Sequence, residues 1–504
     1  MASFAHTLSR RIVFLLFVAT FLPAGSTFGQ KSSEKETRPN VLFITLDDMN
    51  WDSLGCTGCK IPGITPHIDK LASEGMRIEH AHVTIAVCQP TRSVWLTGRY
   101  PHNNGALGFQ PINPKVPTLT EQLRKAGYFN GIMAKVPHLT PQYKFAWDVV
   151  VPASELRVGR DPKSYYEHAK KFFEQARKAN KPFFLMANSQ DPHRPFARSQ
   201  QEKLRKKIRK TLKKNQNQKA KARKKRSRNY PPASRYYRPD EVSVPDFLPD
   251  IPPVRLEIAE YFTSVHRADE IVGAVLRALD ETGFRKNTIV VFMSDHGMPL
   301  PFAKTNCYFN STRTPLIVRW PGQIKAGVVD RRHMVSGIDF TPTILEAVGL
   351  KPLQGVDGRS YLSILKGEKQ DRRDDVYTVF HRTAARRDYP MRSVVTRQFG
   401  YIYNAWSDGK TVFRNESQSG RTWRAMMAAG RTNPKIASRV KLFSYRVKEE
   451  LYDYANDPNA LQNLIDDPKY AKTLANLRSK MRAKMNQYGD PLLSRFQREI
   501  FAKP

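Results

Sequence analysis

A chain of 504 residues is long enough to bury one very large hydrophobic core or two to three ordinary ones. Apolar residues make up 40% of it and charged residues 26%, which excludes a disordered or membrane-embedded class and is typical of a globular enzyme. The formal net charge of +37 favours an anionic partner, such as nucleic acid, an anionic membrane surface or an acidic polysaccharide.

Residues 1–29 have the pattern of an export signal. Arg10 and Arg11 precede the apolar run IVFLLFVATFL, and small residues follow, with cleavage expected after Gly29. The run is shorter than the ~20 apolar residues that span a bilayer. We therefore expect an exported protein, periplasmic or extracellular, without a membrane span.

Short runs rich in valine, isoleucine and phenylalanine predict buried β-strands. They lie at residues 41–47, 129–135, 182–189, 288–295 and 315–320. Segments with helical spacing lie between them, the clearest at 164–179 and 257–283. Continuous apolar strands interleaved with helices predict an α/β fold, in which helices cover both faces of a mostly parallel sheet.

The composition changes near residue 370. Beyond it, residues 392–406 have the pattern of paired strands and residues 468–489 that of a helix. We therefore expect a catalytic domain at 30–370 and a smaller α+β subdomain at 371–504.

A basic insert occupies residues 198–228. It contains 16 lysines and arginines against the single acid Glu202. A solvated loop is the simplest interpretation, and such a loop would also collect polyanions.

Ionisable residues follow four of the predicted strands, at the edge where a parallel sheet binds its ligands. They are Asp47 and Asp48, Lys135 and His138, Asp191 and His193, and Asp295 and His296. One polar strand end is routine, because every strand must stop. Four ends that all carry metal-ligand or acid–base side chains indicate a functional site.

The acidic strand ends predict a metal site. Carboxylates placed close together repel each other unless a cation lies between them. Asp47, Asp48 and Asp295 would supply oxygen ligands, with His296 as a further ligand. An oxygen-rich set favours calcium, with magnesium as the alternative.

Cationic and imidazole side chains could complete the site. Lys135, Arg92 and Lys304 could surround a tetrahedral oxyanion and offset the charge that develops when a bond to a leaving group breaks. His138 and His193 are candidates for proton transfer, because imidazole titrates near neutral pH.

Cys88 lies in a turn-like setting, Cys88-Gln-Pro-Thr-Arg92. Three interpretations are open for it: half of a disulfide, a thiolate whose pKa Arg92 lowers, or a residue chemically altered before use. Four cysteines are too few for a disulfide framework.

The segment Cys88-Gln-Pro-Thr-Arg92, followed by SVWLTGRYPHNNG, resembles the C-x-P-x-R signature of the type I sulfatases of the alkaline-phosphatase-like superfamily. Four further stretches are most similar to the sulfamidase (N-sulfoglucosamine sulfohydrolase, heparan N-sulfatase) branch of that family. They are QDPHRPF, SDHGMPLPFAKTN, YPMRSVVTRQFGYIYN and ELYDYANDPNALQNL. The resemblance extends from residue 40 to about 495.

This resemblance implies that a separate maturation enzyme oxidises Cys88 to formylglycine, whose hydrate attacks sulfur. It implies that the metal ligands are Asp47, Asp48, the modified residue 88, Asp295 and His296. Roles in catalysis and substrate binding are implied for five further residues: Arg92 and Lys135 hold the hydrate and the sulfate, His138 deprotonates the hydrate, His193 protonates the leaving group, and Lys304 binds a sulfate oxygen.

Three positions differ from the family pattern. Lys135-Val-Pro-His138 stands where the family usually has Lys-x-His, and His296 stands where many relatives have asparagine. Lys304 occupies a position that is arginine in sulfamidase, and a lysine lacks the bidentate geometry of a guanidinium. This last exchange counts against an N-sulfate relative to an O-sulfate.

The leading hypothesis is a formylglycine-dependent sulfohydrolase of sulfated saccharides, with N-sulfoglucosamine as the best single substrate. Hydrolysis of O-sulfate esters or of phosphate and phosphonate monoesters is the enzymatic alternative. A polyanion-binding protein without activity is the alternative from another class. No specific nucleic acid is expected as a partner. The chain contains no G-x-G-x-x-G, P-loop or G-x-S-x-G element, so a nucleotide cofactor and a serine-hydrolase mechanism lack support.

Overall fold

The computed structural model describes residues 38–203 and 230–502. The expected export signal at 1–29 and most of the basic insert, from residue 204 onward, lie outside the described residues. Within the described part, no helix combines the length and the apolar character needed to cross a membrane.

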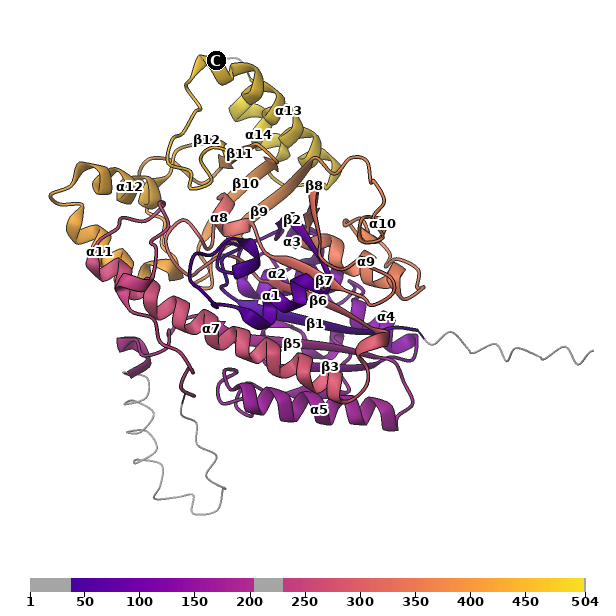
Figure 1. Ribbon diagram of the computed structural model, residues 1–504. Helices are drawn as coiled ribbons and strands as arrows, with labels where there is room; N and C mark the ends of the chain where they lie inside the picture. Colours follow the sequence, from indigo (N-terminus) through magenta and orange to yellow (C-terminus); the bar gives the residue numbers. More distant parts are fainter. Residues whose placement is uncertain (1–37, 204–229, 503–504) are drawn as a thin grey trace, which may run out of the picture. The chain divides into compact units, whose positions relative to one another are not determined.

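The core of the protein is an eight-stranded sheet with the order β4-β3-β5-β1-β6-β7-β2-β8 (Figure 1). Its strands are β1 (Asn40–Asp47), β2 (Met76–His82), β3 (Phe129–Met133), β4 (Val149–Val151), β5 (Phe183–Pro192), β6 (Thr288–Ser294), β7 (Leu316–Arg319) and β8 (Val328–Ser336). β7 runs antiparallel to both neighbours, and every other pair in the sheet is parallel. The predicted mostly parallel α/β sheet is therefore confirmed.

Three strands of this sheet, β2, β4 and β8, were not predicted from the sequence. β2 alternates between buried and half-buried residues, β4 has three residues, and β8 begins with partly exposed residues. None of them has the continuous apolar run by which the other five strands were recognised.

Helices cover both faces of this sheet. They are α1 (Pro66–Ser73), α2 (Cys88–Thr97), α3 (Pro101–Asn104), α4 (Leu119–Lys125), α5 (Pro162–Lys178), α7 (Pro252–Glu281), α8 (Phe309–Thr312), α9 (Phe340–Ala347) and α10 (Leu362–Leu365). Successive residues of β1 point to opposite faces. Leu42 and Ile44 pack in a core with side chains of α5 and α7, whereas Val41 and Phe43 pack in a second core with side chains of α4 and α9.

A smaller antiparallel sheet with the order β12-β11-β10-β9 follows in the chain. Its strands are β9 (Asp375–Arg382), β10 (Asp388–Thr396), β11 (Phe399–Asn404) and β12 (Glu449–Asp453), and its helices are α11 (Arg421–Ala429), α12 (Pro434–Tyr445), α13 (Ala471–Gln487) and α14 (Leu493–Phe501). Its apolar side chains belong to the same core as α5 and α7. The α+β character expected for the C-terminal part is confirmed, and the boundary at residue 370 stays a prediction.

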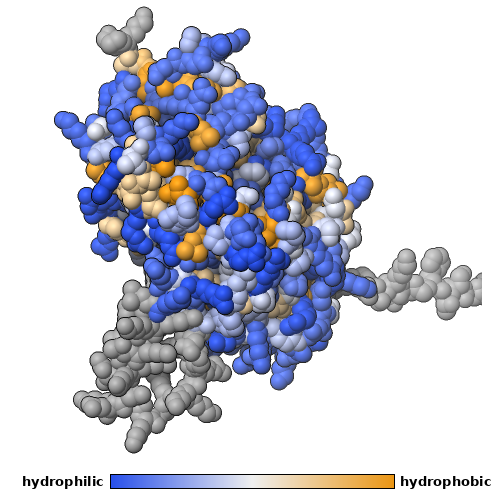
Figure 2. All heavy atoms as spheres, turned by 60° about the vertical axis from the view of Figure 1, so that its left-hand side comes forward, coloured by the Kyte–Doolittle hydropathy of each residue, from blue (hydrophilic) through white to orange (hydrophobic). Residues whose placement is uncertain are grey.

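The two sheets are joined by polar contacts as well as by the shared core. The backbone N–H of Val379 in β9 donates to the carbonyl of Thr84, which follows β2, at 2.8 Å. Within the smaller sheet, Arg392 of β10 forms a buried ion pair with Asp490, between α13 and α14. The surface in Figure 2 is mostly hydrophilic, with small separate hydrophobic patches.

Candidate active site

The carboxyl ends of β1 and β6 bring Asp47, Asp48 and Asp295 together. In the parallel register Leu46 lies opposite Ser294, so the next residues of both strands are neighbours. The backbone N–H of Asp48 donates to Asp295 Oδ1 at 2.9 Å. Asp48 has a φ of 69°, in the left-handed region, and this turns the chain at the strand end. All three carboxylates are fully buried.

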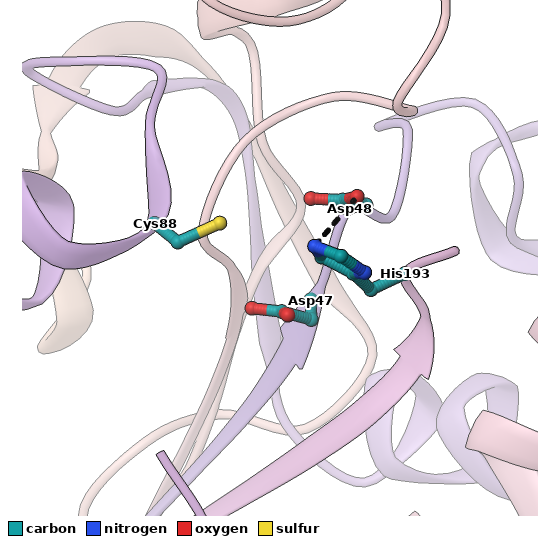
Figure 3. A group of neighbouring side chains, drawn as sticks. All are labelled: Asp47, Asp48, Cys88 and His193. Atoms are coloured by element: carbon teal, nitrogen blue, oxygen red, sulfur yellow. Dashed lines mark ion pairs between the residues drawn. The ribbon is translucent and has the colours of Figure 1, made fainter. Parts of the chain in front are cut away.

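Cys88, at the start of the buried helix α2, points toward Asp47 and Asp48 (Figure 3). Its Sγ atom lies 3.4 Å from Nε2 of His296. Two overlapping sets of residues could each hold a metal ion, because within each set the potential ligand atoms all lie within 4.8 Å of one another. The sets are Asp47, Asp48, Cys88 and His193, and Asp48, Cys88, Asp295 and His296. Buried carboxylate oxygens with an imidazole nitrogen at this spacing fit a divalent cation.

Three buried cations balance the carboxylates. Arg92 bridges Asp47 at 2.8 Å and Asp295 at 2.7 Å. Lys135 forms an ion pair with Asp47, and Lys304 forms one with Asp48 at 2.9 Å. Buried charges persist when they are paired in this way, and removing one partner leaves a costly uncompensated charge.

The charges of the cluster perturb the titration of its acids. Burial by itself would raise the pKa of Asp47, but Lys135 and Arg92 outweigh it and hold that pKa well below its usual value. Burial and the negative charge of Asp47 raise the pKa of Asp295. The pKa values of these two neighbouring carboxylates are therefore shifted in opposite directions, because Asp47 receives most of the stabilisation by the cations.

Two of the three interpretations of Cys88 do not agree with the structure. All four cysteines are free thiols, so Cys88 is not half of a disulfide. Arg92 donates to the carbonyl oxygen of Cys88 at 3.0 Å, and burial raises the pKa of the thiol well above its usual value. A thiol in this setting stays protonated and is a poor nucleophile. Chemical alteration before use stays a prediction.

His193 follows β5 and faces the cluster through its Nε2 atom. Nδ1 lies 2.5 Å from the carbonyl oxygen of Arg194, whereas Nε2 lies 3.9 Å from Asp48 and 3.1 Å from Glu416. Burial would lower the pKa of His193, but Asp48 and Glu416 outweigh it and raise the pKa. The imidazole is therefore suited to give a proton from Nε2.

A buried charge network holds the segment that carries His193. Arg160 donates to the carbonyl oxygen of His193 at 2.8 Å and also pairs with Asp191. Arg267, on α7, pairs with Asp191 at 2.6 Å. Because the backbone of His193 is tied to this network, the position of its imidazole depends on charges deep in the fold.

His138 lies beside the cluster rather than within it. It ends a short 3₁₀ turn, Val136–His138, that follows Lys135. Its ring meets Phe109 edge-on at 5.8 Å, and its Nδ1 atom is buried without a hydrogen-bond partner in the described part of the chain. Burial, with Lys135 and Arg92, holds the pKa of His138 well below its usual value, so the ring is neutral.

Glu416 is a site residue that the sequence analysis missed. It begins the 3₁₀ turn Glu416–Ser419 and lies 3.1 Å from both His193 Nε2 and Lys304 Nζ. The surrounding sequence, RNESQS, is a polar stretch with no motif and no strand end. No signal in the sequence marks it, because its role depends on a contact between segments far apart in the chain.

A cavity of about 330 Å³ opens beside the cluster. Its lining residues are Val87, Thr305, Thr383, Ala384, Ala385, Arg387, Arg414, Asn415 and Glu416. Val87 precedes Cys88 and Thr305 follows Lys304, so the cavity leads to the cluster. The guanidinium groups of Arg387 and Arg414 form no ion pair with any residue that the structure describes.

A larger cavity, of about 810 Å³, lies among α1, α5 and α7, near the amino end of β6. None of the residues predicted for the site lines it. The size of this cavity does not by itself indicate a reaction. The smaller cavity is the better candidate for substrate binding, because it adjoins acids and bases whose pKa values are shifted.

Glu257, on α7, connects two walls of the site. It pairs with Arg194, next to His193, at 3.1 Å and accepts a hydrogen bond from the backbone N–H of Thr422. Gly420 lies against this pair, because a Cβ atom there would lie 2.1 Å from a nitrogen of Arg194. The segment that follows Glu416 is thereby packed against the segment that carries His193.

Family models and related proteins agree with this geometry. Residues 39–350 match the model of the sulfatase family, and residues 295–411 match that of the C-terminal domain of N-sulphoglucosamine sulphohydrolase. The human N-sulphoglucosamine sulphohydrolase is 30% identical over 468 residues, which cover 88% of this chain and 89% of that protein. An ulvan-active sulfatase of Formosa agariphila is 27% identical over 494 residues, which cover 92% and 77% of the two chains.

Solved structures show the same fold. One is a complex with its substrate, D-glucosamine-2-N,6-O-disulfate; it has a TM-score of 0.65 and 20% identity and covers 90% of this chain and 99% of its own. A phosphonate monoester hydrolase of Agrobacterium radiobacter has a TM-score of 0.60 and 18% identity and covers 90% and 96% of the two chains. The alkaline-phosphatase-like architecture is thus confirmed. The chain belongs to the sulfatase family, whose members hydrolyse sulfate esters or sulfamates.

Proposed function

We propose that the protein releases sulfate from sulfated saccharides and that the N-sulfate of glucosamine is its preferred substrate. The proposal rests on one observation: Cys88, three buried carboxylates, three buried cations and His193 meet at one edge of the sheet. The sulfamidase-type C-terminal match and the human relative support the choice of an N-sulfate.

Cys88 is the residue that matures into the nucleophile. Its buried thiol has no partner for a disulfide, and burial outweighs the charge of Lys304, so the pKa stays well above its usual value and the thiol stays protonated. Formylglycine at this position supplies a hydrated aldehyde, an oxygen nucleophile that a cysteine cannot offer. A formylglycine-generating enzyme is therefore a required partner, and export through the signal at residues 1–29 is part of the proposal.

Asp47, Asp48, Asp295 and His296 would hold a divalent cation together with residue 88. The donor set is rich in carboxylate oxygen, so calcium is the proposed ion and magnesium the alternative. Such an ion supplies Lewis acidity at the sulfate and favours a deprotonated oxygen nucleophile.

The remaining side chains divide the proton transfers and the binding of the sulfate. The neutral His138 would accept the proton of the nucleophile, and the protonated His193 would give one to the leaving atom. The opposite shifts of their pKa values support this division. Arg92, Lys135 and Lys304 would stabilise the anionic sulfate as its bond to the leaving group breaks.

An O-sulfate ester is the second candidate substrate, and Lys304 is the observation that favours it. Its ammonium group pairs with both oxygens of Asp48 and lacks the planar fork of the arginine that sulfamidase has here. Hydrolysis of phosphate or phosphonate monoesters stays a prediction, because likeness to a phosphonate hydrolase at 18% identity concerns the fold alone.

The Cys88→Ala variant tests the proposal. We expect sulfate release to be abolished while the protein stays folded, because one small buried side chain replaces another. Mass spectrometry of the peptide that contains residue 88 in the wild-type protein should detect the aldehyde. Undiminished turnover in the variant, or an intact thiol in fully active wild-type protein, would exclude the mechanism.

A further inference from the structure

Glu416 is a carboxylate at the point where the 330 Å³ cavity meets the buried cluster. It comes from the segment between β11 and β12, whereas the other charged groups of the cluster come from the large sheet and from α2. Its side chain is 32% exposed and contacts both Nε2 of His193 and Nζ of Lys304, each at 3.1 Å. Lys304 and His193 hold the pKa of Glu416 well below its usual value against the effect of burial, so the group is an anion.

Glu416 lies beside the nitrogen of His193 that would face a leaving atom. The Nδ1 atom of His193 faces the carbonyl oxygen of Arg194, so Nε2 is the atom that can give a proton to a leaving group. Glu416 lies within hydrogen-bond distance of that same Nε2 atom. A leaving atom that takes the proton must therefore lie close to a carboxylate.

Sulfamates and sulfate esters differ at this atom. The nitrogen of a sulfamate carries a hydrogen atom and can donate a hydrogen bond to a carboxylate. The bridging oxygen of a sulfate ester carries only lone pairs, which a carboxylate repels. A site built to accept a hydrogen bond discriminates strongly against an analogue that cannot donate one.

We infer, on the basis of the proposed sulfohydrolase function, that Glu416 selects sulfamates over sulfate esters by accepting a hydrogen bond from the sulfamate N–H. As sulfur forms its new bond to the oxygen nucleophile at residue 88, His193 gives its Nε2 proton to the nitrogen. The S–N bond breaks, and its electron pair stays on the nitrogen. The released amine takes up one further proton from water. The resulting ammonium group then faces the carboxylate of Glu416, which stabilises its positive charge.

Two substrates that differ in one atom test the inference: 2-N-sulfoglucosamine and glucose 2-O-sulfate. We compare kcat/KM for sulfate release by the wild-type protein, Glu416→Gln and the control Glu368→Gln, which removes an exposed carboxylate outside the site. Glu416→Gln should lower kcat/KM for the sulfamate at least about 10-fold more than kcat/KM for the ester, because the loss of its charge beside His193 affects both substrates and the loss of the hydrogen bond affects only the sulfamate. Glu368→Gln should change neither value.

The outcomes separate the inference from the function on which it rests. Equal losses on both substrates would overturn the inference, because they would mean that Glu416 acts only by positioning His193 and Lys304. Wild-type protein that releases sulfate from the ester alone would overturn the N-sulfate assignment before any variant is compared. Glu416→Asp, which keeps the charge, should retain the preference for the sulfamate and serves as the second variant if the glutamine variant does not fold.

Discussion

The two sides of the active site are built in different ways. On one side, Asp47, Asp295 and Arg92 are fully buried, and each is held by partners from other elements. On the other side, the cavity wall contributed by the C-terminal subdomain has half-exposed and exposed groups, namely Glu416, Arg387 and Arg414. In the proposed function, the large sheet would supply the groups that act on sulfur, whereas the second region would supply the groups that recognise what the sulfur is attached to.

This difference follows from how each region is stabilised. The ends of β1 and β6 are fixed by the register of a parallel ladder, and any shift would disrupt the close packing of the cores on both faces. Loops such as residues 383–387, between β9 and β10, run over the surface and tolerate change. A family with one reaction and many substrates can therefore keep the first region and vary the second.

The largest effect is expected from Asp47→Asn. The variant removes the carboxylate that pairs with Lys135 and bridges to Arg92, and uncompensated buried charge costs about 3–5 kcal/mol of folding free energy. We expect kcat/KM for sulfate release to fall by at least about 10²-fold. Calorimetry with calcium should detect binding to the wild-type protein and none to the variant. Asp374→Asn, at an exposed ion pair, is the control. Full turnover by Asp47→Asn would place the chemistry elsewhere.

The next effect concerns the buried network under His193. Asp191→Asn leaves Arg160 and Arg267 without their shared anion, so the free energy of unfolding should fall by about 3 kcal/mol. Turnover at a temperature where the variant is folded should fall as well, because the carbonyl of His193 is bonded to Arg160. Urea denaturation measures the first quantity. Asp240→Asn removes an exposed partner of Arg238 and should change neither stability nor turnover; equal effects of the two variants would contradict the role of the network.

A moderate effect is expected from pH on the smaller sheet. Burial would raise the pKa of Asp490, but Arg392 outweighs it and lowers this pKa to about 2. Because the folded-state pKa is depressed, the stabilisation is complete above the unfolded pKa of about 4 and is lost as pH falls toward 2. The stability lost over this interval should be about 2 kcal/mol. Denaturation curves across this pH range, compared with those of Asp490→Asn, measure it, and an identical pH dependence in both proteins would contradict the assignment.

The smallest effect is expected at the rim of the cavity. Arg387→Ala and Arg414→Ala should each raise KM for D-glucosamine-2-N,6-O-disulfate roughly two- to five-fold. KM for the singly sulfated sugar should change less, because it lacks the second anionic group. Arg331→Ala, at an exposed arginine outside the cavity, is the control. Equal changes with both sugars would show that these arginines do not recognise a second anion.

Much of the larger region could be predicted from residue patterns. Asp47 and Asp295 end apolar runs, and parallel strands place such ends at one edge, so their proximity was expected before any contact was known. Arg92 and Lys304 were expected there from their charge and from the sulfatase signature. The antiparallel direction of β7 was not expected, because an apolar run has the same pattern in either direction.

The second region could not be predicted in the same way. Glu416 reaches His193 and Lys304 only through tertiary packing, and its neighbours in the chain are ordinary polar residues. For His138, in the segment Lys135-Val-Pro-His138, the motif alone did not predict the position of the side chain. His138 follows Lys135 with one extra residue between them, its ring lies beside Phe109 rather than bonded to the cluster, and its proton-transfer role stays a prediction.

The double attachment of Glu257 has a consequence for engineering. The carboxylate of Glu257 binds Arg194, which is next to His193. It also binds the backbone of Thr422, which follows Glu416 in the chain. A mutant library confined to cavity-lining positions would not include position 257, although a substitution of Glu257 would displace both His193 and Glu416. Laboratory evolution toward new sulfated sugars should therefore randomise position 257 along with the residues that contact the ligand.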